Sequence, residues 1–206
     1  MKRTFGHAWL AAAALLATAE AADAHIAASR LGDFYAGALH PLSDLQDVIL
    51  WAALGMLAGS LGASAGRWLV LVFPLGLLAG LVSGLAFGIV SAGPVADAGM
   101  IVLLGLLLAA NMRIPTAPLC AIAVGLALMR GAANASDLAP ETNRLLFAAG
   151  LACAGYAAIT LTMALTLAFR GTDPGASIAW RGIAIRALGS WIAAIGLMMG
   201  GFALVS

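Results

Sequence analysis

The chain has 206 residues, of which 63% are hydrophobic and only 9% are charged, and its formal net charge is +1. A soluble domain of this length could not bury so much apolar surface in one core, so the composition predicts a membrane protein. The small net charge and the scattered basic residues exclude a general affinity for nucleic acid.

The N-terminus has the features of a cleavable signal peptide. A basic start (residues 2–3) precedes an apolar run over residues 8–18, and Ala-Asp-Ala at 22–24 fits a signal peptidase site. The alternative is an uncleaved first span, but the run is too short to cross a hydrocarbon core of about 30 Å comfortably. We therefore expect residues 1–24 to be removed and the mature chain to begin at His25.

Apolar segments separated by short polar hinges make up the rest of the chain. Helix is expected in each segment because an exposed strand edge in lipid would leave backbone groups unpaired. Pro115 and Pro118 leave only a tight turn between the third and fourth segments, which predicts a helical hairpin. The fold class is therefore an all-α membrane protein, a bundle of six transmembrane helices. The predicted spans are residues 46–63, 68–91, 97–112, 115–131, 143–169 and 178–204.

Charge placement predicts the orientation of the bundle. With the mature N-terminus outside, the inner connections carry Arg67, Arg113, Arg170 and Arg181, while most acids fall on the outer side. This asymmetry predicts a multi-pass protein of the bacterial inner membrane with both termini outside. The outer acids are Asp33, Asp44, Asp47, Asp97, Asp137 and Glu141.

Glycines spaced four residues apart recur in the first two spans. Gly55 with Gly59, and Gly76 with Gly80, each lie on one helix face, where they would let a neighbouring backbone come close. Close packing is the expected role of these faces, and a glycine-lined conduit is the alternative.

The segment GALHPLSDLQD gathers polar residues just before the first span. On one helix, His40, Asp44 and Asp47 occupy positions i, i+4 and i+7, so an imidazole and two carboxylates would share a face. This ligand set suits a divalent transition metal, and His25 would add an imidazole and a free α-amino group. We expect an outer entry site for a divalent cation.

The same segment has a purely structural interpretation. Pro41 fits the first turn of a helix, where its missing N–H costs nothing, and Asp44 and Asp47 would lie near the positive end of that helix. In this interpretation His40 is a solvated surface residue.

Two segments of the chain resemble the HupE/UreJ family of hydrogenase and urease accessory membrane proteins. Residues 37–43 (GALHPLS), which follow a signal peptide and lead into a span, are similar to the first family motif. Residues 130–137 (RGAANASD) align with the family segment HGAAHGAE, and RALG at 186–189 is also similar. The resemblance covers residues 25–206 as a single transmembrane domain, and it implies about six spans and transport of nickel.

The chain departs from both family motifs at their histidines. The first motif reads His-Pro, four residues, then Asp-His, and this chain has Gln46 and Asp47 at the last two positions. In the second motif Arg130 and Asn134 replace the two histidines, while Asp137 keeps the acid in a shorter form. By resemblance, Gln46, Arg130, Asn134 and Asp137 belong to a pathway or second site, poorer in nitrogen ligands than a nickel site would be.

Two functions remain open from the sequence. The first is a permease that moves a divalent metal cation, nickel or a related ion; the second is a non-transporting membrane accessory protein for metalloenzyme assembly. The charge of Arg130 would repel a divalent ion unless Asp137 or Glu141 neutralises it. The expected partners are the lipid bilayer, a transient divalent metal ion and metalloenzyme maturation proteins, with no tightly bound cofactor. An enzyme is not expected, because no predicted span contains a histidine and no nucleotide or zinc-protease motif occurs.

Overall fold

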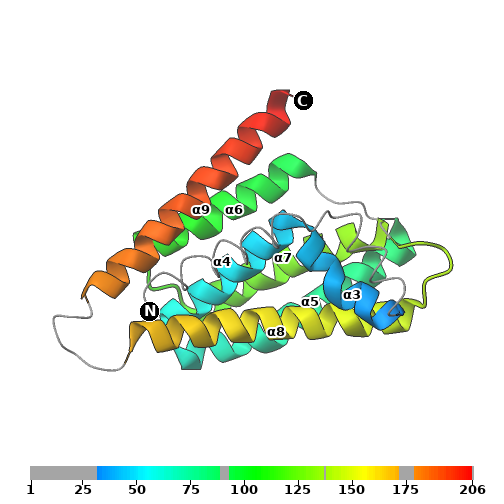
Figure 1. The fold of residues 1–206 in the computed structure, drawn as a ribbon, viewed down its shortest axis with the longest axis horizontal. Coiled ribbons are helices and arrows are strands. Elements are labelled where there is room, and N and C mark those ends of the chain that lie inside the picture. The colour runs from blue at the N-terminus through cyan, green and yellow to red at the C-terminus, as the bar shows by residue number, and fades with distance from the viewer. Residues whose placement is uncertain (1–31, 89–92, 137, 172–178, 206) are drawn as a thin grey trace, which may run out of the picture.

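A computed structural model describes residues 32–88, 93–136, 138–171 and 179–205. The predicted signal peptide, His25 and Asp137 therefore lie outside the described residues. Within the described ranges every regular element is a helix (Figure 1). The helices are α3 (Asp33–Ser43), α4 (Leu45–Leu61), α5 (Ala63–Phe87), α6 (Pro94–Ala110), α7 (Thr116–Ser136), α8 (Arg144–Arg170) and α9 (Ala179–Val205).

The six predicted apolar segments correspond to α4 through α9, so the all-helical prediction is confirmed. Among the described residues, four helices are long and apolar enough to cross a membrane, namely α5, α7, α8 and the Trp180–Val205 part of α9. The bent pair of α3 and α4 would add a fifth span, and α6 is shorter, with 17 residues. The full number of six spans stays a prediction.

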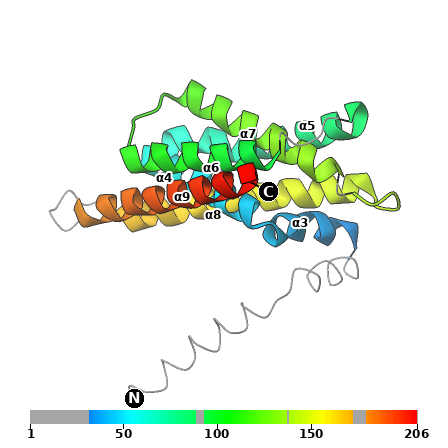
Figure 2. The same ribbon diagram turned by 90° about the horizontal axis from the view of Figure 1, so that it is seen from above.

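The helices form a main bundle with one further pair beside it. α5 packs on α7 and α8, while α3 and α4 pack on α8; α6 pairs with α9 and meets the main bundle chiefly through α4 (Figures 1 and 2). The predicted hairpin of the third and fourth segments is wrong. Residues 111–115 do join α6 to α7, but α6 packs against α9 and α7 packs against α5.

Glycines explain why α7 packs on α5. A Cβ atom at Gly80 would lie 2.3 Å from the backbone oxygen of Leu128, and one at Gly76 would lie 2.7 Å from the Cβ of Ala127. Only a residue without a side chain lets the two backbones come this close. The glycine faces therefore serve packing, as expected, while Gly88 ends α5 in the left-handed conformation with φ +63°.

The pairing of α6 with α9 depends on glycines from both helices. A Cβ at Gly105 of α6 would lie 2.4 Å from the backbone nitrogen of Ala193, and one at Gly189 of α9 would lie 2.6 Å from that of Ala109. Because both helices lack side chains at the crossing, their backbones touch and the register between them is fixed.

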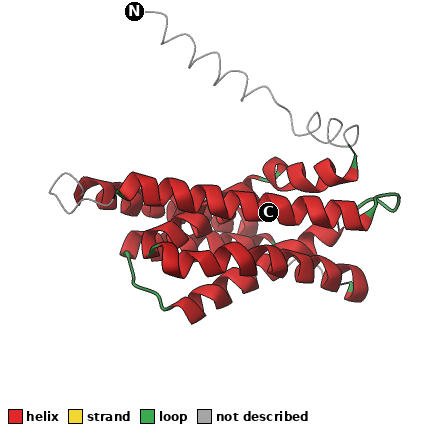
Figure 3. Ribbon diagram, turned by 90° about the horizontal axis from the view of Figure 1, so that it is seen from below, coloured by secondary structure: helices red, strands yellow, loops and turns green. Residues whose placement is uncertain are grey.

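Opposite charges collect at opposite ends of the helices. Most of the helices run along one common direction (Figure 3), and α4 and α6 end, and α5 and α7 begin, at the same end of the molecule (Figure 1). Arg67, Arg113 and Arg170 belong to this end by their positions in the chain. The described acids belong to the other end, where α3, the starts of α4 and α6 and the loop before α8 lie. The charge asymmetry in the sequence is thus an asymmetry of the folded bundle.

Candidate functional site

A sharp break at Asp44 separates α3 from α4, whose axes differ by 83°. The Asp44 backbone is extended (φ −105°, ψ 110°), and its Oδ1 accepts a hydrogen bond of 2.8 Å from the Gln46 backbone N–H, which caps α4. The predicted continuous helix with His40, Asp44 and Asp47 on one face is therefore wrong. A side chain that caps the next helix competes with continuation of the preceding one.

Pro41 also lies elsewhere than predicted. It is buried in the last turn of α3 and does not begin a helix; Asp44 marks the start of α4 instead. Packing on α8 explains why a helix precedes the proline: a Cβ at Gly37 would lie 2.1 Å from the Phe147 backbone oxygen, so α3 fits closely against that helix. This gain from packing outweighs the hydrogen bond that Pro41 cannot donate.

Arg130 of α7 lies at the centre of a buried ionic cluster. Its Nε donates to Oδ1 of Asp47 at 2.6 Å, its Nη1 donates to Oδ2 of Asp97 at 3.1 Å, and its Nη2 donates to Oδ2 of Asp44. The three aspartates come from the α3–α4 break, α4 and α6, so one guanidinium joins three parts of the fold. The planar fork of donors on arginine makes this three-way contact possible.

The cluster is closed on most sides and open at one residue. The side chains of Arg130 and Asp97 are each 7% exposed and that of Asp47 is 1% exposed, whereas the Asp44 side chain is 38% exposed. Three carboxylates facing one guanidinium leave two excess negative charges when all are ionised. A buried excess of this kind favours uptake of a cation or of protons.

Polar atoms without partners lie on residues of the cluster and beside it. Asp47 Oδ2 and Asn134 Oδ1 are buried and accept no hydrogen bond from the described part of the protein, and Trp51 Nε1, one turn after Asp47, donates none. Asn134 is anchored by its other atom, since its Nδ2 donates to the Arg130 carbonyl at 2.6 Å. Two buried acceptor oxygens thus remain for water, a proton donor or a cation.

The remaining predicted site residues lie around this cluster or outside the described residues. His40 sits near the end of α3, and its ring meets that of Phe147 edge-on, with centroids 5.8 Å apart. Gln46 is partly exposed and lines a separate cleft beside α9. The sequence placed His25 and Asp137 in the site, but both fall in segments whose structure is not described. Across the described ranges, no group of three or more His, Cys, Asp or Glu side chains is arranged to hold a metal ion.

The sequence did not identify the partners of Arg130. The expected acids were Asp137 and Glu141, which are near in sequence, but the described partners come from other helices. Asp97 was counted only as an outer acid. Its signal was present in the sequence, because a carboxylate in the first turn of an otherwise apolar segment needs a partner.

The geometry places both motif segments in one site: Asp44 and Asp47 from the first meet Arg130 and Asn134 from the second. The chain matches the HupE / UreJ protein family over residues 13–199. The chain belongs to the HupE/UreJ family. Protein HupE of Rhizobium leguminosarum bv. viciae is 34% identical to it over 143 residues, which cover 68% of this chain and 73% of that protein. No solved structure is significantly similar to the chain.

Membership in the HupE/UreJ family, together with the apolar helices, makes the chain a multi-pass membrane protein of the hydrogenase and urease accessory type. Family membership also relates the cluster to the two motifs. Asp47, Arg130 and Asn134 of this chain, at the motif positions where the resemblance leads us to expect histidine, lie together in the fold. The ion pair of Asp47 and Arg130 occupies two of these positions.

Proposed function

We propose that this HupE/UreJ protein moves a divalent metal cation, nickel or a related ion, across the bacterial inner membrane. The observation that carries the proposal is the buried cluster of Asp44, Asp47, Asp97 and Arg130, whose carboxylates outnumber its guanidinium by two. Such an excess is costly inside an apolar bundle, and a divalent cation would compensate it.

In this proposal Arg130 acts as a tethered cation that holds the aspartates together between transport events. An incoming ion meets Asp44 first, because Asp44 is the exposed member of the cluster. It then competes with the guanidinium for Asp47 and Asp97, so binding is loose, as a permease requires. The oxygen-rich ligand set is harder than an imidazole site, which shifts preference towards ions that accept carboxylate ligands.

A second candidate function is a non-transporting accessory protein for metalloenzyme assembly. The observation that favours it is that Arg130 contacts all three aspartates, so each already has a charged partner. In that case the ion pair replaces a lost metal path and serves only to join α4, α6 and α7. The two candidates make opposite predictions for variants that preserve the fold.

Uptake of nickel, cobalt, copper, zinc and manganese into cells with and without the protein tests the proposal. We expect the protein to raise uptake of at least one metal, and Asp97→Asn to reduce that uptake about ten-fold or more. The informative variant is the charge-balanced pair Asp47→Asn with Arg130→Gln, which removes one charge of each sign. It should partly restore membrane levels of the protein relative to Arg130→Gln alone, because one buried carboxylate fewer is left without a cationic partner, but it should not restore uptake.

Arg144→Gln is the matched control, since Arg144 is an exposed arginine at the start of α8, outside the cluster. It should transport like the wild-type protein. If the charge-balanced pair also transports normally, the cluster is structural and lies off the ion path. If the wild-type protein changes uptake of no metal in the panel, the permease proposal is wrong and the accessory function is favoured.

A further inference from the structure

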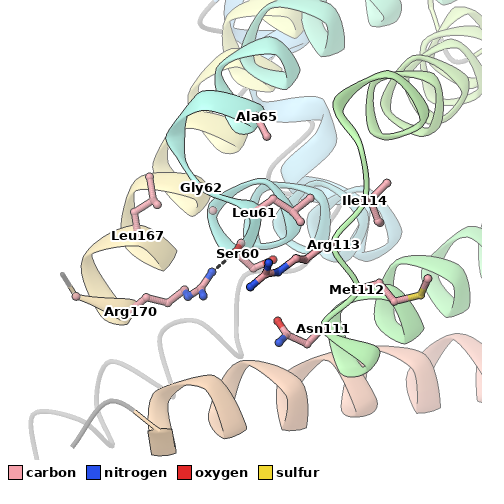
Figure 4. Close-up of a pocket in the computed structure, with 12 residues that line it drawn as sticks. Ser60, Leu61, Gly62, Ala65, Asn111, Met112, Arg113, Ile114, Leu167 and Arg170 are labelled. Atoms are coloured by element: carbon pink, nitrogen blue, oxygen red, sulfur yellow. Dashed lines mark hydrogen bonds between the residues drawn. The ribbon is translucent and has the colours of Figure 1, made fainter. Parts of the chain in front are cut away.

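A second polar site lies at the basic end of the bundle, far from the cluster along the helices. It is a cavity of about 660 Å³ between the end of α4, the α6–α7 connection and the end of α8 (Figure 4). Figure 4 shows the guanidinium groups of Arg113 and Arg170 on either side of Ser60, with the Asn111 amide on the same side of the cavity. The volume is in the range of small-molecule sites.

Among the described residues, the charged side chains at this cavity are all arginines. Arg113 and Arg170 line it, and no acid is among its described lining residues. Arg181 borders it as well, since its Nη1 would lie 2.7 Å from a Cβ on the lining residue Gly171. Within the described ranges none of these three arginines has a carboxylate in ion-pair contact, because the ion pairs found there all involve Arg130.

One of the arginines is already held in position. Arg170 donates from Nη1 to the Ser60 backbone oxygen at the end of α4, which satisfies a carbonyl left open by the helix terminus. Within the described part of the chain, its remaining N–H groups and all those of Arg113 meet no acceptor, so they can bind a ligand. Two guanidinium groups and an amide around one cavity suit the tetrahedral oxygens of a phosphate.

The apolar part of the cavity indicates where such a phosphate would come from. Leu61, Ile114 and Leu167 line it beside the arginines, and the cavity lies at the ends of helices that cross the apolar layer. A phospholipid presents this combination, a charged phosphate directly above apolar chains. A free phosphate ion would use the arginines alone.

We infer that this cavity is a binding site for a phosphate group, occupied in the membrane by the headgroup of an anionic phospholipid. The site is independent of the proposed transport, because it shares no residue with the Arg130 cluster. Each arginine contributes attraction that corresponds to about a five-fold change in affinity for an anionic headgroup.

Native mass spectrometry of the purified full-length protein with phosphatidylglycerol or phosphatidylcholine tests the inference. We expect phosphatidylglycerol to bind more tightly, and Arg113→Gln to raise its dissociation constant about five-fold. Arg113 is exposed and makes no hydrogen bond within the described residues, so this variant should fold; an unchanged melting temperature verifies that. The matched control is Arg67→Gln, which removes an exposed arginine from the same end of the bundle but outside the cavity.

A titration with inorganic phosphate distinguishes the two sources. If phosphate displaces phosphatidylglycerol and its own binding depends on Arg113, the site takes soluble phosphate as well; if phosphate does not compete, the lipid is the specific ligand. Both results support a phosphate site. Equal losses of affinity for phosphatidylglycerol in Arg113→Gln and Arg67→Gln would mean only general surface attraction and would overturn the inference. An unchanged affinity in both variants would overturn it as well.

Discussion

Arg130 Nε and Asp47 Oδ1 lie 2.6 Å apart although 83 positions separate the two residues in the chain, and their side chains are 7% and 1% exposed. By their resemblance to the HupE/UreJ motifs, both residues stand at positions where histidine is expected. Two positions expected to carry imidazoles thus carry opposite charges in direct contact. Without Arg130, the buried carboxylate of Asp47 would lack its only charged partner among the described residues, so Asp47 depends on Arg130.

This dependence predicts a large coupling energy between the two residues. Arg130→Ala should destabilise the protein by about 3 kcal/mol, because it leaves Asp47 and Asp97 buried without a cation, whereas Asp47→Ala should cost less, because Arg130 keeps Asp44 and Asp97 as partners. The double variant should lose much less unfolding free energy than the sum of the losses in the two single variants. Equilibrium unfolding of the four proteins in one detergent measures the coupling, and additivity within about 0.5 kcal/mol would contradict it.

The geometry of the guanidinium predicts that lysine cannot replace Arg130. A single ammonium keeps the charge, but it cannot direct parallel donors at three carboxylates from different helices. Arg130→Lys should therefore melt well below the wild-type protein, yet above Arg130→Gln. Arg144→Lys, at an exposed position, should melt like wild type. Equal melting temperatures for Arg130→Lys and wild type would show that charge alone suffices.

Asp44 has two roles that substitutions can separate. Its Oδ1 caps α4 and its Oδ2 binds Arg130. Asp44→Ser keeps a capping oxygen but loses the charge, whereas Asp44→Ala loses both. The difference in unfolding free energy between the two variants should be about 1 kcal/mol, the value of an N-cap. If both variants have the same stability, the cap contributes nothing at this break.

The crossing of α6 and α9 predicts opposite effects for two glycine substitutions in one helix. Gly105→Ala places a Cβ 2.4 Å from the Ala193 backbone nitrogen and should lower the free energy of unfolding by about 1–3 kcal/mol. Gly99→Ala meets no heavy atom within 4 Å and should be neutral or stabilising by up to about 1 kcal/mol. Thermal unfolding of both variants compares them directly, and equal stability would show that the crossing is looser than described.

The orientation is also open to a direct test. We expect both ends of the mature chain outside, so a fused reporter after Ser206 that works only outside the cytoplasm should be active. Single cysteines at Glu141 and Arg113 should react with an impermeant reagent added outside and inside, respectively. A reporter active only in the cytoplasm would reverse the arrangement, and with it the side from which the Asp44 edge of the cluster is reached.

The apolar segments could be predicted from sequence because lipid leaves so few options for a backbone. Each segment must satisfy its own hydrogen bonds, so hydropathy alone locates α4 to α9 within a few residues. α3 was not predicted, because it depends on Gly37 and Gly150 meeting the backbones of each other's helices. Contacts of that kind have no local signature.

The candidate site could be predicted only in part for the same reason. Asp44, Asp47, Arg130 and Asn134 were singled out from their motifs, but the first two were expected on one straight helix together with His40. The Asp44 cap bends the chain by 83° and turns the carboxylates towards a helix far away in sequence. The link from Asp97 to Arg130 needed the three-dimensional fold, since nothing in sequence spacing relates them.

The close crossing of α6 with α9 gives the last helix an influence on the ionic cluster, although α9 supplies none of its described ion pairs. Asp97 lies in the first turn of α6, eight residues before Gly105, so the backbone contact at the crossing constrains the position of its carboxylate along the bundle. A slip of α9 by one turn would carry α6 with it and draw Asp97 about 5 Å away from Arg130. The C-terminal helix thus helps to fix the position of Asp97 relative to Arg130. Substitutions in α9 that shift the crossing should therefore change the contacts of Arg130.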